Sequence, residues 1–139
     1  MKKVPLPICT DSYKAKNTSL YKDGTEFLYS YYESRGGRYD KTVMFGLQYF
    51  IKEYLLTPVT KEDIDYAETF WMQHFGNDKV FVRENWDYIL KEYRGKLPVS
   101  IKAVPEGSLV DTHNVLFTIE KAKDSALKSP RKNNWDGVL

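Results

Sequence analysis

Two arginines flank a glycine pair in the segment ESRGGR, residues 33–38, and these residues are the best suited to chemistry. Glycine lets the backbone approach a ligand closely, successive backbone amides can bind an anion, and an arginine fork matches phosphate oxygens. The segment fits a phosphate cradle, an RGG-type nucleic-acid element, or a turn between a strand and a helix. RGG elements come in repeats and this one is single, and a Gly-Gly turn needs no ligand, so the residues alone favour the turn.

A cysteine, two histidines and a pair of acids are weaker candidates. Cys9 is the only cysteine and both histidines lie far from it in sequence, so we expect a buried apolar side chain rather than a nucleophile. His74 falls in the last turn of an expected helix, where it favours the helix dipole, and no metal-ligand spacing surrounds it. His113 falls in an expected hairpin loop. Glu62 and Asp63 are better explained as acids at a helix start than as an acid–base pair.

The composition favours one soluble globular domain. The chain has 139 residues, of which 42% are hydrophobic and 15% aromatic, enough to form a core. The formal net charge of +2 is too small to indicate nucleic acid as a partner. The N-terminal apolar stretch is too short and too proline-broken for a signal peptide, and nothing reaches the ~18 apolar residues of a membrane span. With no possible internal disulfide, the chain is expected to be cytoplasmic. We expect no membrane contact, and nucleic-acid binding through the RGG segment and the basic tail of residues 121–139 is the weakest of the functions considered.

The first half of the chain predicts a short helix, a strand and a longer helix. The segment TDSYK places Thr10 or Asp11 at the start of a short helix, and KDGTE predicts a turn after it. Residues 27–34, FLYSYYES, are β-prone, with Phe27, Tyr29 and Tyr31 on one face. Leu28, Ser30 and Tyr32 occupy the other face, which predicts a strand covered on both sides. In residues 42–55 the apolar side chains recur at helical spacing, which predicts an amphipathic helix.

The second half predicts two helices and then two strands. One helix begins after Thr60 as the N-cap and ends at Gly76, and another, around residues 84–95, stops at its final glycine. Apolar and polar residues alternate in 98–103 and 114–120, which predicts two half-buried strands. This order favours an α+β fold, a small mixed domain with about three helices packed on a mostly antiparallel sheet.

The expected domain covers residues 1–120, and residues 121–139 differ from it in character. This last segment holds five Lys or Arg against two Asp and has few apolar residues. It predicts a basic, mobile or weakly helical tail, more typical of a solvated chain end than of a nucleic-acid contact.

Several short sequence segments together resemble the N-terminal part of the nicotinamide phosphoribosyltransferase family, a group of type II phosphoribosyltransferases. The segments are TDSYK, YSYYESRGG, KTVMFGLQYFIKEYL, IKAVPEG and NVLFTIE, and the resemblance covers residues 8–120. It implies enzymes that join nicotinamide to phosphoribosyl pyrophosphate, releasing pyrophosphate and forming nicotinamide mononucleotide for NAD synthesis, with magnesium accompanying the pyrophosphate. It also implies homodimers whose active sites lie at the subunit interface.

Carried over by position, the resemblance gives three residues a role in substrate binding across the dimer. Tyr13 would stack on the nicotinamide ring, Asp11 would orient the ring amide or its partners, and Arg35 would reach the phosphate groups. No catalytic residue and no metal ligand is implied. The sequence departs from the family's pattern at Asn17, where a histidine is usual, and at Lys22–Asp23, where two prolines are usual.

The match ends near Glu120, whereas the family continues into a helical and barrel portion that holds most substrate contacts. We therefore expect the chain to be inactive alone and to bind no cofactor by itself. It fits a truncated gene product, one part of a split enzyme, or a repurposed domain. The alternative function is an interaction or regulatory module that docks a full-length phosphoribosyltransferase subunit.

Overall fold

Two units make up the chain in the computed structural model, which describes residues 4–22 and 24–122. Of these residues, the first unit holds 4–22, 24–25 and 57–97, and the second holds 26–56 and 98–122. Helices build the first unit and antiparallel strands dominate the second, so the predicted α+β class is confirmed. None of the helices in the described ranges combines the length and apolar character that a membrane span requires. The predicted tail lies outside the described residues from position 123 onward.

Two 3-10 helices and two α-helices form the described part of the first unit: η1 (Leu6–Ile8), η2 (Ser12–Leu20), α2 (Lys61–Phe75) and α3 (Arg83–Tyr93). A capping box begins α2. The Thr60 hydroxyl accepts the Asp63 N–H at 3.2 Å, and the Asp63 carboxylate accepts the Thr60 N–H at 2.9 Å. Gly76 ends the helix in the left-handed conformation, with φ of 67°. Both predicted ends of this helix are confirmed.

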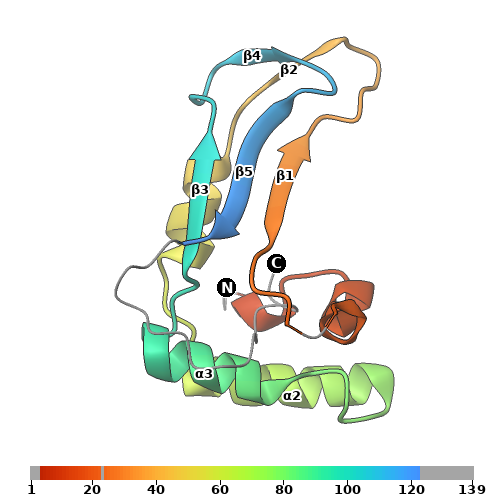
Figure 1. Cartoon of the computed structure of the whole chain (residues 1–139), viewed down its shortest axis with the longest axis vertical. Helices are drawn as coiled ribbons and strands as arrows, with labels where there is room; N and C mark the ends of the chain where they lie inside the picture. The colour runs from red at the N-terminus through yellow and green to blue at the C-terminus, as the bar shows by residue number, and fades with distance from the viewer. Residues whose placement is uncertain (1–3, 23, 123–139) are drawn as a thin grey trace. The chain divides into compact units, whose positions relative to one another are not determined.

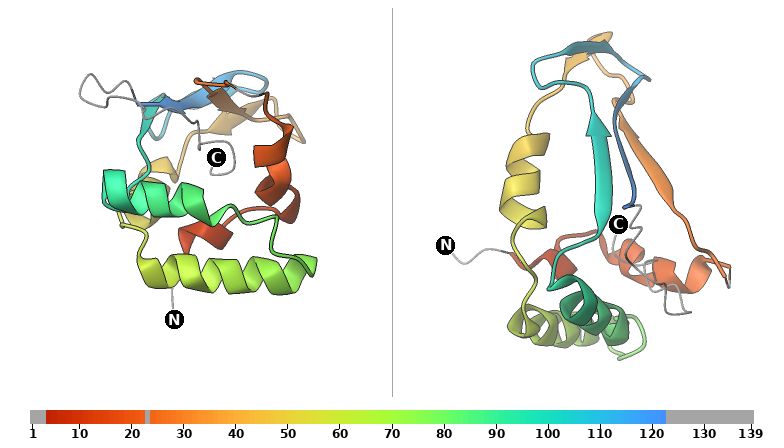
Figure 2. Two further views of the ribbon diagram at one scale, coloured as in Figure 1. Left: turned by 60° about the horizontal axis from the view of Figure 1, so that its bottom comes forward. Right: turned by 60° about the vertical axis from the view of Figure 1, so that its left-hand side comes forward.

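The core of the first unit forms along one side of α2. Ile64, Ala67 and Trp71 are buried there, as their spacing predicts. The indole N–H of Trp71 donates to the carbonyl of Pro7 at 3.1 Å, and Ala15 of η2 packs against Ala67 and Trp71. Figures 1 and 2 show α3 beside α2. These contacts attach the N-terminal segment to α2.

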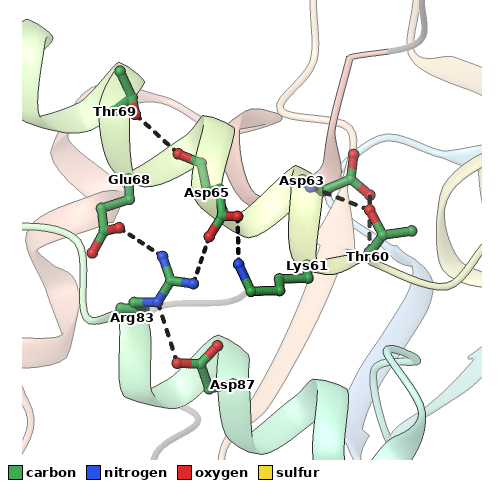
Figure 3. A network of polar contacts seen from close by, with 8 residues as sticks. All are labelled: Thr60, Lys61, Asp63, Asp65, Glu68, Thr69, Arg83 and Asp87. Atoms are coloured by element: carbon green, nitrogen blue, oxygen red, sulfur yellow. Dashed lines mark hydrogen bonds and ion pairs between the residues drawn. The ribbon is translucent and has the colours of Figure 1, made fainter.

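An ion-pair network around Arg83 links α3 to α2 (Figure 3). The guanidinium donates to Asp65 and Glu68 on α2, both at 2.6 Å, and lies 3.3 Å from Asp87 on α3. Lys61 approaches Asp65 at 2.7 Å. Hydrogen bonds from Lys61 and from Arg83 hold the pKa of Asp65 below its usual value. In turn, the hydrogen bonds to Asp65 and Glu68 raise the pKa of Arg83. The two helices are thus joined by charges at the surface.

The end of α3 meets the segment that leads into α2. The Val59 N–H donates to the Gly95 carbonyl at 2.8 Å. A Cβ built on Gly95 would lie 2.2 Å from the Val59 oxygen, and Gly95 has φ of 76°. Both the close approach and the left-handed backbone require glycine here. The third helix ends slightly before the predicted stop at this glycine, because Arg94 already adopts the left-handed C-cap conformation after Tyr93.

A three-stranded sheet forms the centre of the second unit (Figure 1). Its middle strand, β5 (Val115–Lys121), pairs antiparallel with β1 (Tyr29–Glu33) on one side and β3 (Val99–Ala103) on the other. A separate antiparallel pair joins β2 (Lys41–Val43) to β4 (Leu109–Asp111). The strands β1, β3 and β5 confirm the predictions. The sequence did not predict β2 and β4, because a strand of 3 residues is too short to show alternation.

The predicted helix over residues 42–55 begins later than expected. Its first residues form β2 instead, and Gly46 in the left-handed conformation, with φ of 98°, separates this strand from the helix. The helix then runs as α1 (Leu47–Phe50) and continues as a π-helical segment, η3 (Ile51–Leu55). Met44 exchanges two backbone hydrogen bonds, of 2.8 and 2.9 Å, with the loop before β4. Pairing with a distant segment therefore overrides the local helical pattern.

The prediction that β1 is covered on both faces is wrong. Phe27, Tyr29 and Tyr31 alternate along one side of the strand, and each is more than half exposed. On the other side, Tyr32 stacks on Phe117 of β5 with ring centroids 5.0 Å apart, yet it is also more than half exposed. Aromatic alternation correctly indicated a strand, but it does not determine whether other residues of the described chain cover that strand.

Candidate functional site

The arginine–glycine segment forms a loop, residues 34–40, that connects β1 to β2. It lies opposite the much shorter turn, residues 112–114, that connects β4 to β5. Two backbone hydrogen bonds join the loop to the turn at its two ends. The His113 N–H donates to the Ser34 carbonyl at 2.8 Å, and the Thr112 N–H donates to the Asp40 carbonyl at 2.9 Å. The loop is therefore held at both ends while its middle extends from the paired strands.

Arg35 is the most available cation of this loop. Its side chain is exposed and has no hydrogen bond or ion pair with any other residue in the described ranges. Arg38 differs, because its guanidinium carbon lies 5.7 Å from the centroid of the Tyr39 ring, a cation–π distance. Gly36, next to Arg35, has φ of 89° and supplies the left-handed backbone that the loop needs. A free guanidinium beside a glycine turn can bind a phosphate group.

One charged pair closes the end of the loop, where β2 begins. The Lys41 ammonium forms an ion pair with Asp111 of β4, and this contact raises the pKa of Lys41 through its hydrogen bond and charge. Lys41 is exposed and already has a partner. Arg35 is therefore the stronger candidate for an incoming anion.

Asp11 and Tyr13 lie together at the start of η2 in the first unit. Asp11 is the N-cap residue, as predicted, although its side chain makes no capping hydrogen bond. Its carboxylate is 3.8 Å from the Lys14 ammonium, which lies 6.0 Å from the centre of the Tyr13 ring. Tyr13 is 66% exposed, so a flat ligand could reach its ring. The structure thus brings two of the three predicted residues together, and Arg35 belongs to the other unit.

The remaining sequence candidates have structural surroundings. His74 accepts or donates a hydrogen bond of 2.9 Å with the Ser12 hydroxyl, and its ring stacks on Phe70 at 6.0 Å. Asp63 belongs to the capping box, so its interpretation as a helix-start acid is confirmed. Cys9 is exposed, so the expectation of a buried thiol is wrong, because the chain leaves the short helix η1 at this residue.

Sequence reasoning gave His113 no role, yet this residue contacts the loop directly. Besides its backbone bond to Ser34, its ring Nε2 would lie 3.4 Å from a Cβ built on Gly36. The sequence signal was weak: a polar residue in a predicted hairpin loop. What distinguishes it is a left-handed backbone, with φ of 63°, which cannot be recognised from a single histidine in a sequence.

The magnesium that the resemblance implies has no ligand set in the part of the chain that the structure describes. No group of three His, Cys, Asp or Glu side chains comes close enough there to hold a metal ion. Among the described residues, the groups available for binding a ligand are the exposed Tyr13 ring, the Asp11 carboxylate and the Arg35 guanidinium, which has no partner there.

Comparison with known proteins identifies the family to which the chain belongs. Residues 5–101 match the family model described as the N-terminal domain of nicotinamide phosphoribosyltransferase. The chain therefore belongs to the nicotinamide phosphoribosyltransferase family, and it corresponds to the N-terminal domain. The resemblance inferred from short sequence words is confirmed.

Two bacterial relatives are both named nicotinamide phosphoribosyltransferase. The chain is 46% identical over 121 residues to the protein of Xanthomonas campestris pv. campestris, an alignment that covers 87% of this chain and 25% of the relative. It is 32% identical over 133 residues to the protein of Acinetobacter baylyi, covering 78% of this chain and 24% of the relative. The chain thus spans about a quarter of the length of these curated relatives.

Proposed function

We propose that this chain provides the N-terminal share of a nicotinamide phosphoribosyltransferase site, which binds nicotinamide and phosphoribosyl pyrophosphate together with a complementary protein part. The reaction transfers a phosphoribosyl group to nicotinamide and releases pyrophosphate. Family membership supports the choice of substrates. The observation that carries the proposal is the exposed Arg35 guanidinium, without a partner in the described ranges, on a loop held at both ends.

Arg35 would act on the phosphate groups. In phosphoribosyl transfer, the bond from the sugar to the leaving diphosphate breaks as positive charge develops on the sugar. A cation fixed beside the departing diphosphate stabilises the negative charge that accumulates there. A planar guanidinium can donate two parallel hydrogen bonds to phosphate oxygens, which lysine cannot do.

Asp11 and Tyr13 would recognise the nicotinamide. The exposed Tyr13 ring offers a face for offset stacking on the flat pyridine ring. The Asp11 carboxylate can accept a hydrogen bond from the carboxamide NH2 group. Its pair with Lys14, at 3.8 Å and largely exposed, is weak enough for a ligand to replace.

The residues that would complete the site are proposed to come from another polypeptide region, in trans across a dimer of the family type. Three-quarters of the relatives' length lies outside the alignment, and magnesium finds no ligand set among the described residues of this chain. We therefore propose that the 139 residues alone form no nicotinamide mononucleotide.

A chimera tests this function. This chain replaces the stretch that it matches in the Xanthomonas campestris relative, and product formation is measured with nicotinamide, phosphoribosyl pyrophosphate and magnesium. We expect an active chimera and an inactive isolated chain. In the chimera, Arg35→Ala should raise the KM for phosphoribosyl pyrophosphate by about tenfold or more, because a charge-assisted hydrogen bond is lost.

Arg38→Ala is the matched control, because this arginine lies in the same loop but is engaged with Tyr39. It should change the KM by less than about twofold. Equal effects of the two substitutions would show that Arg35 contributes only positive charge to the loop. Turnover by the isolated chain would contradict the need for a complementary part.

A second candidate function is a non-catalytic module that docks a full-length phosphoribosyltransferase subunit. The exposed aromatic side chains Phe27, Tyr29 and Tyr31 favour it, because contiguous exposed apolar surface commonly marks a protein interface. Light scattering of the chain mixed with the Xanthomonas campestris relative measures this association. Complex formation that Tyr31→Ala weakens would support docking, and the absence of any complex at micromolar concentrations would exclude it.

A further inference from the structure

His113 adopts a backbone conformation that a residue with a side chain normally avoids. Among the described residues, the non-glycine residues with positive φ are His113, at 63°, and Arg94, at 54°. Arg94 has an evident reason, because it ends α3 as a left-handed C-cap. His113 ends no helix. Glycine would adopt the same conformation without strain, so the side chain of His113 calls for a role of its own.

The contacts of His113 surround Arg35 on both sides along the chain. The His113 backbone N–H holds the carbonyl of Ser34, the residue before Arg35, at 2.8 Å. The His113 ring lies over Gly36, the residue after Arg35, with Nε2 and Cε1 at 3.4 and 3.9 Å from the position of a Cβ there. A methyl group at position 36 would therefore lie in ordinary van der Waals contact with the ring, so the ring borders the space beside Gly36.

We propose that His113 is a positioning residue for Arg35: its backbone holds Ser34 and its ring borders Gly36, which limits the motion of the arginine loop, so that the guanidinium is already oriented for a phosphate group. The phosphate as ligand rests on the proposed function, whereas the ordering of the loop does not. Two adjacent glycines give this loop many conformations. Restricting them before binding reduces the entropy lost when the ligand is bound, which increases affinity.

The first experiment measures loop order directly in the full 139-residue chain. Backbone amide order parameters are measured by NMR for residues 35–37 in the wild type, His113→Gly and His113→Asn. Glycine and asparagine both accept the left-handed backbone, so these variants remove the ring and keep the turn. We expect order parameters to fall from the range of a rigid backbone to below about 0.6, with a melting temperature that is unchanged or higher.

Arg94→Gly is the matched control, because it relieves the same kind of backbone strain in the first unit. It should leave the order parameters of residues 35–37 unchanged. Unchanged loop order in His113→Gly and His113→Asn would overturn the inference.

The second experiment follows the binding of inorganic pyrophosphate to the same chain by NMR titration. We expect His113→Gly to weaken binding about threefold to tenfold, with Arg35→Ala weakening it further. In the Arg35→Ala background, His113→Gly should have no additional effect, because it acts through that arginine. A merely structural substitution would instead weaken both backgrounds equally, and that result would overturn the inference.

The two experiments separate the inference from the proposed function. If loop order falls but pyrophosphate does not bind in an Arg35-dependent way, the positioning by His113 stands and the phosphate role of Arg35 in this chain is rejected. If binding depends on Arg35 while the His113 substitutions change neither loop order nor affinity, the proposed function stands and the inference is wrong.

Discussion

The two units bury their apolar side chains to very different extents. In the first unit, α2 and α3 bury Ile64, Trp71 and Ile89 and add the surface network of Arg83. In the second unit, Met44 and Leu116 are the buried apolar residues within the described ranges, while many aromatic side chains are exposed. The first unit is therefore stabilised by a core of its own, whereas the second leaves most of its aromatic side chains exposed among the described residues. Substitutions in the first unit should therefore lower the free energy of unfolding more than substitutions at exposed positions of the second unit.

The largest expected effect is in the core of the first unit. Trp71→Ala removes a buried ring and its hydrogen bond to Pro7. It should lower the free energy of unfolding by about 3–5 kcal/mol, measured by urea denaturation with circular dichroism. Tyr31→Ala, at an exposed position of the second unit, should change it by less than about 0.5 kcal/mol. A comparable loss in the two variants would break the contrast between the units.

A smaller effect is expected where the ends of α2 and α3 meet. Gly95→Ala places a methyl group against the Val59 carbonyl and forces alanine into a left-handed backbone conformation. The free energy of unfolding should therefore fall by about 2–3 kcal/mol. Gly24→Ala is the control, because its φ of 85° is also left-handed but no atom of the described residues lies within 4 Å of a Cβ built there. It should cost only about 1 kcal/mol. Equal losses would show that the close approach contributes nothing beyond the backbone conformation.

The smallest effect concerns the pH dependence of the first unit. The pKa of Asp65 is lowered in the folded state from its ordinary 3.8, mainly by Lys61 and Arg83. Its contribution to stability is therefore fully present above the unfolded-state pKa and is lost as the pH falls through the lower folded-state value. The urea midpoint of the wild type should fall between pH 5 and pH 2 by more than that of Asp65→Asn. An identical pH dependence in both proteins would show that the network adds no measurable stability.

The sequence predicted best where one helix contains its own signals. For α2, the N-cap Thr60, the acid Asp63 and the terminal Gly76 are all local, so both ends could be read directly. The prediction was wrong where a distant partner decides the structure. The backbone of Met44 pairs with the loop before β4, so the expected helix starts later than its pattern predicts. The exposure of Tyr31 likewise depends on residues far away in sequence.

The candidate site was less accessible to sequence reasoning than the fold. Bare residues favoured a simple turn at Gly36, and only the family resemblance gave Tyr13, Asp11 and Arg35 their roles. These three roles stay predictions. His113 was missed because its importance lies in a backbone angle and in a contact across two loops, neither of which leaves a pattern in the chain.

Two hydrogen bonds hold the ends of the 34–40 loop. The pairing of the strands therefore does not depend on the length of the loop. Residues inserted between Gly36 and Gly37 would enlarge the loop without shifting the register of β1 or β2. Loop closure becomes less favourable by only about 0.6 kcal/mol for each doubling of length. The reach of the arginine could therefore be lengthened or shortened by insertion, and the junction of the two glycines is a natural place to attach a probe or a graft.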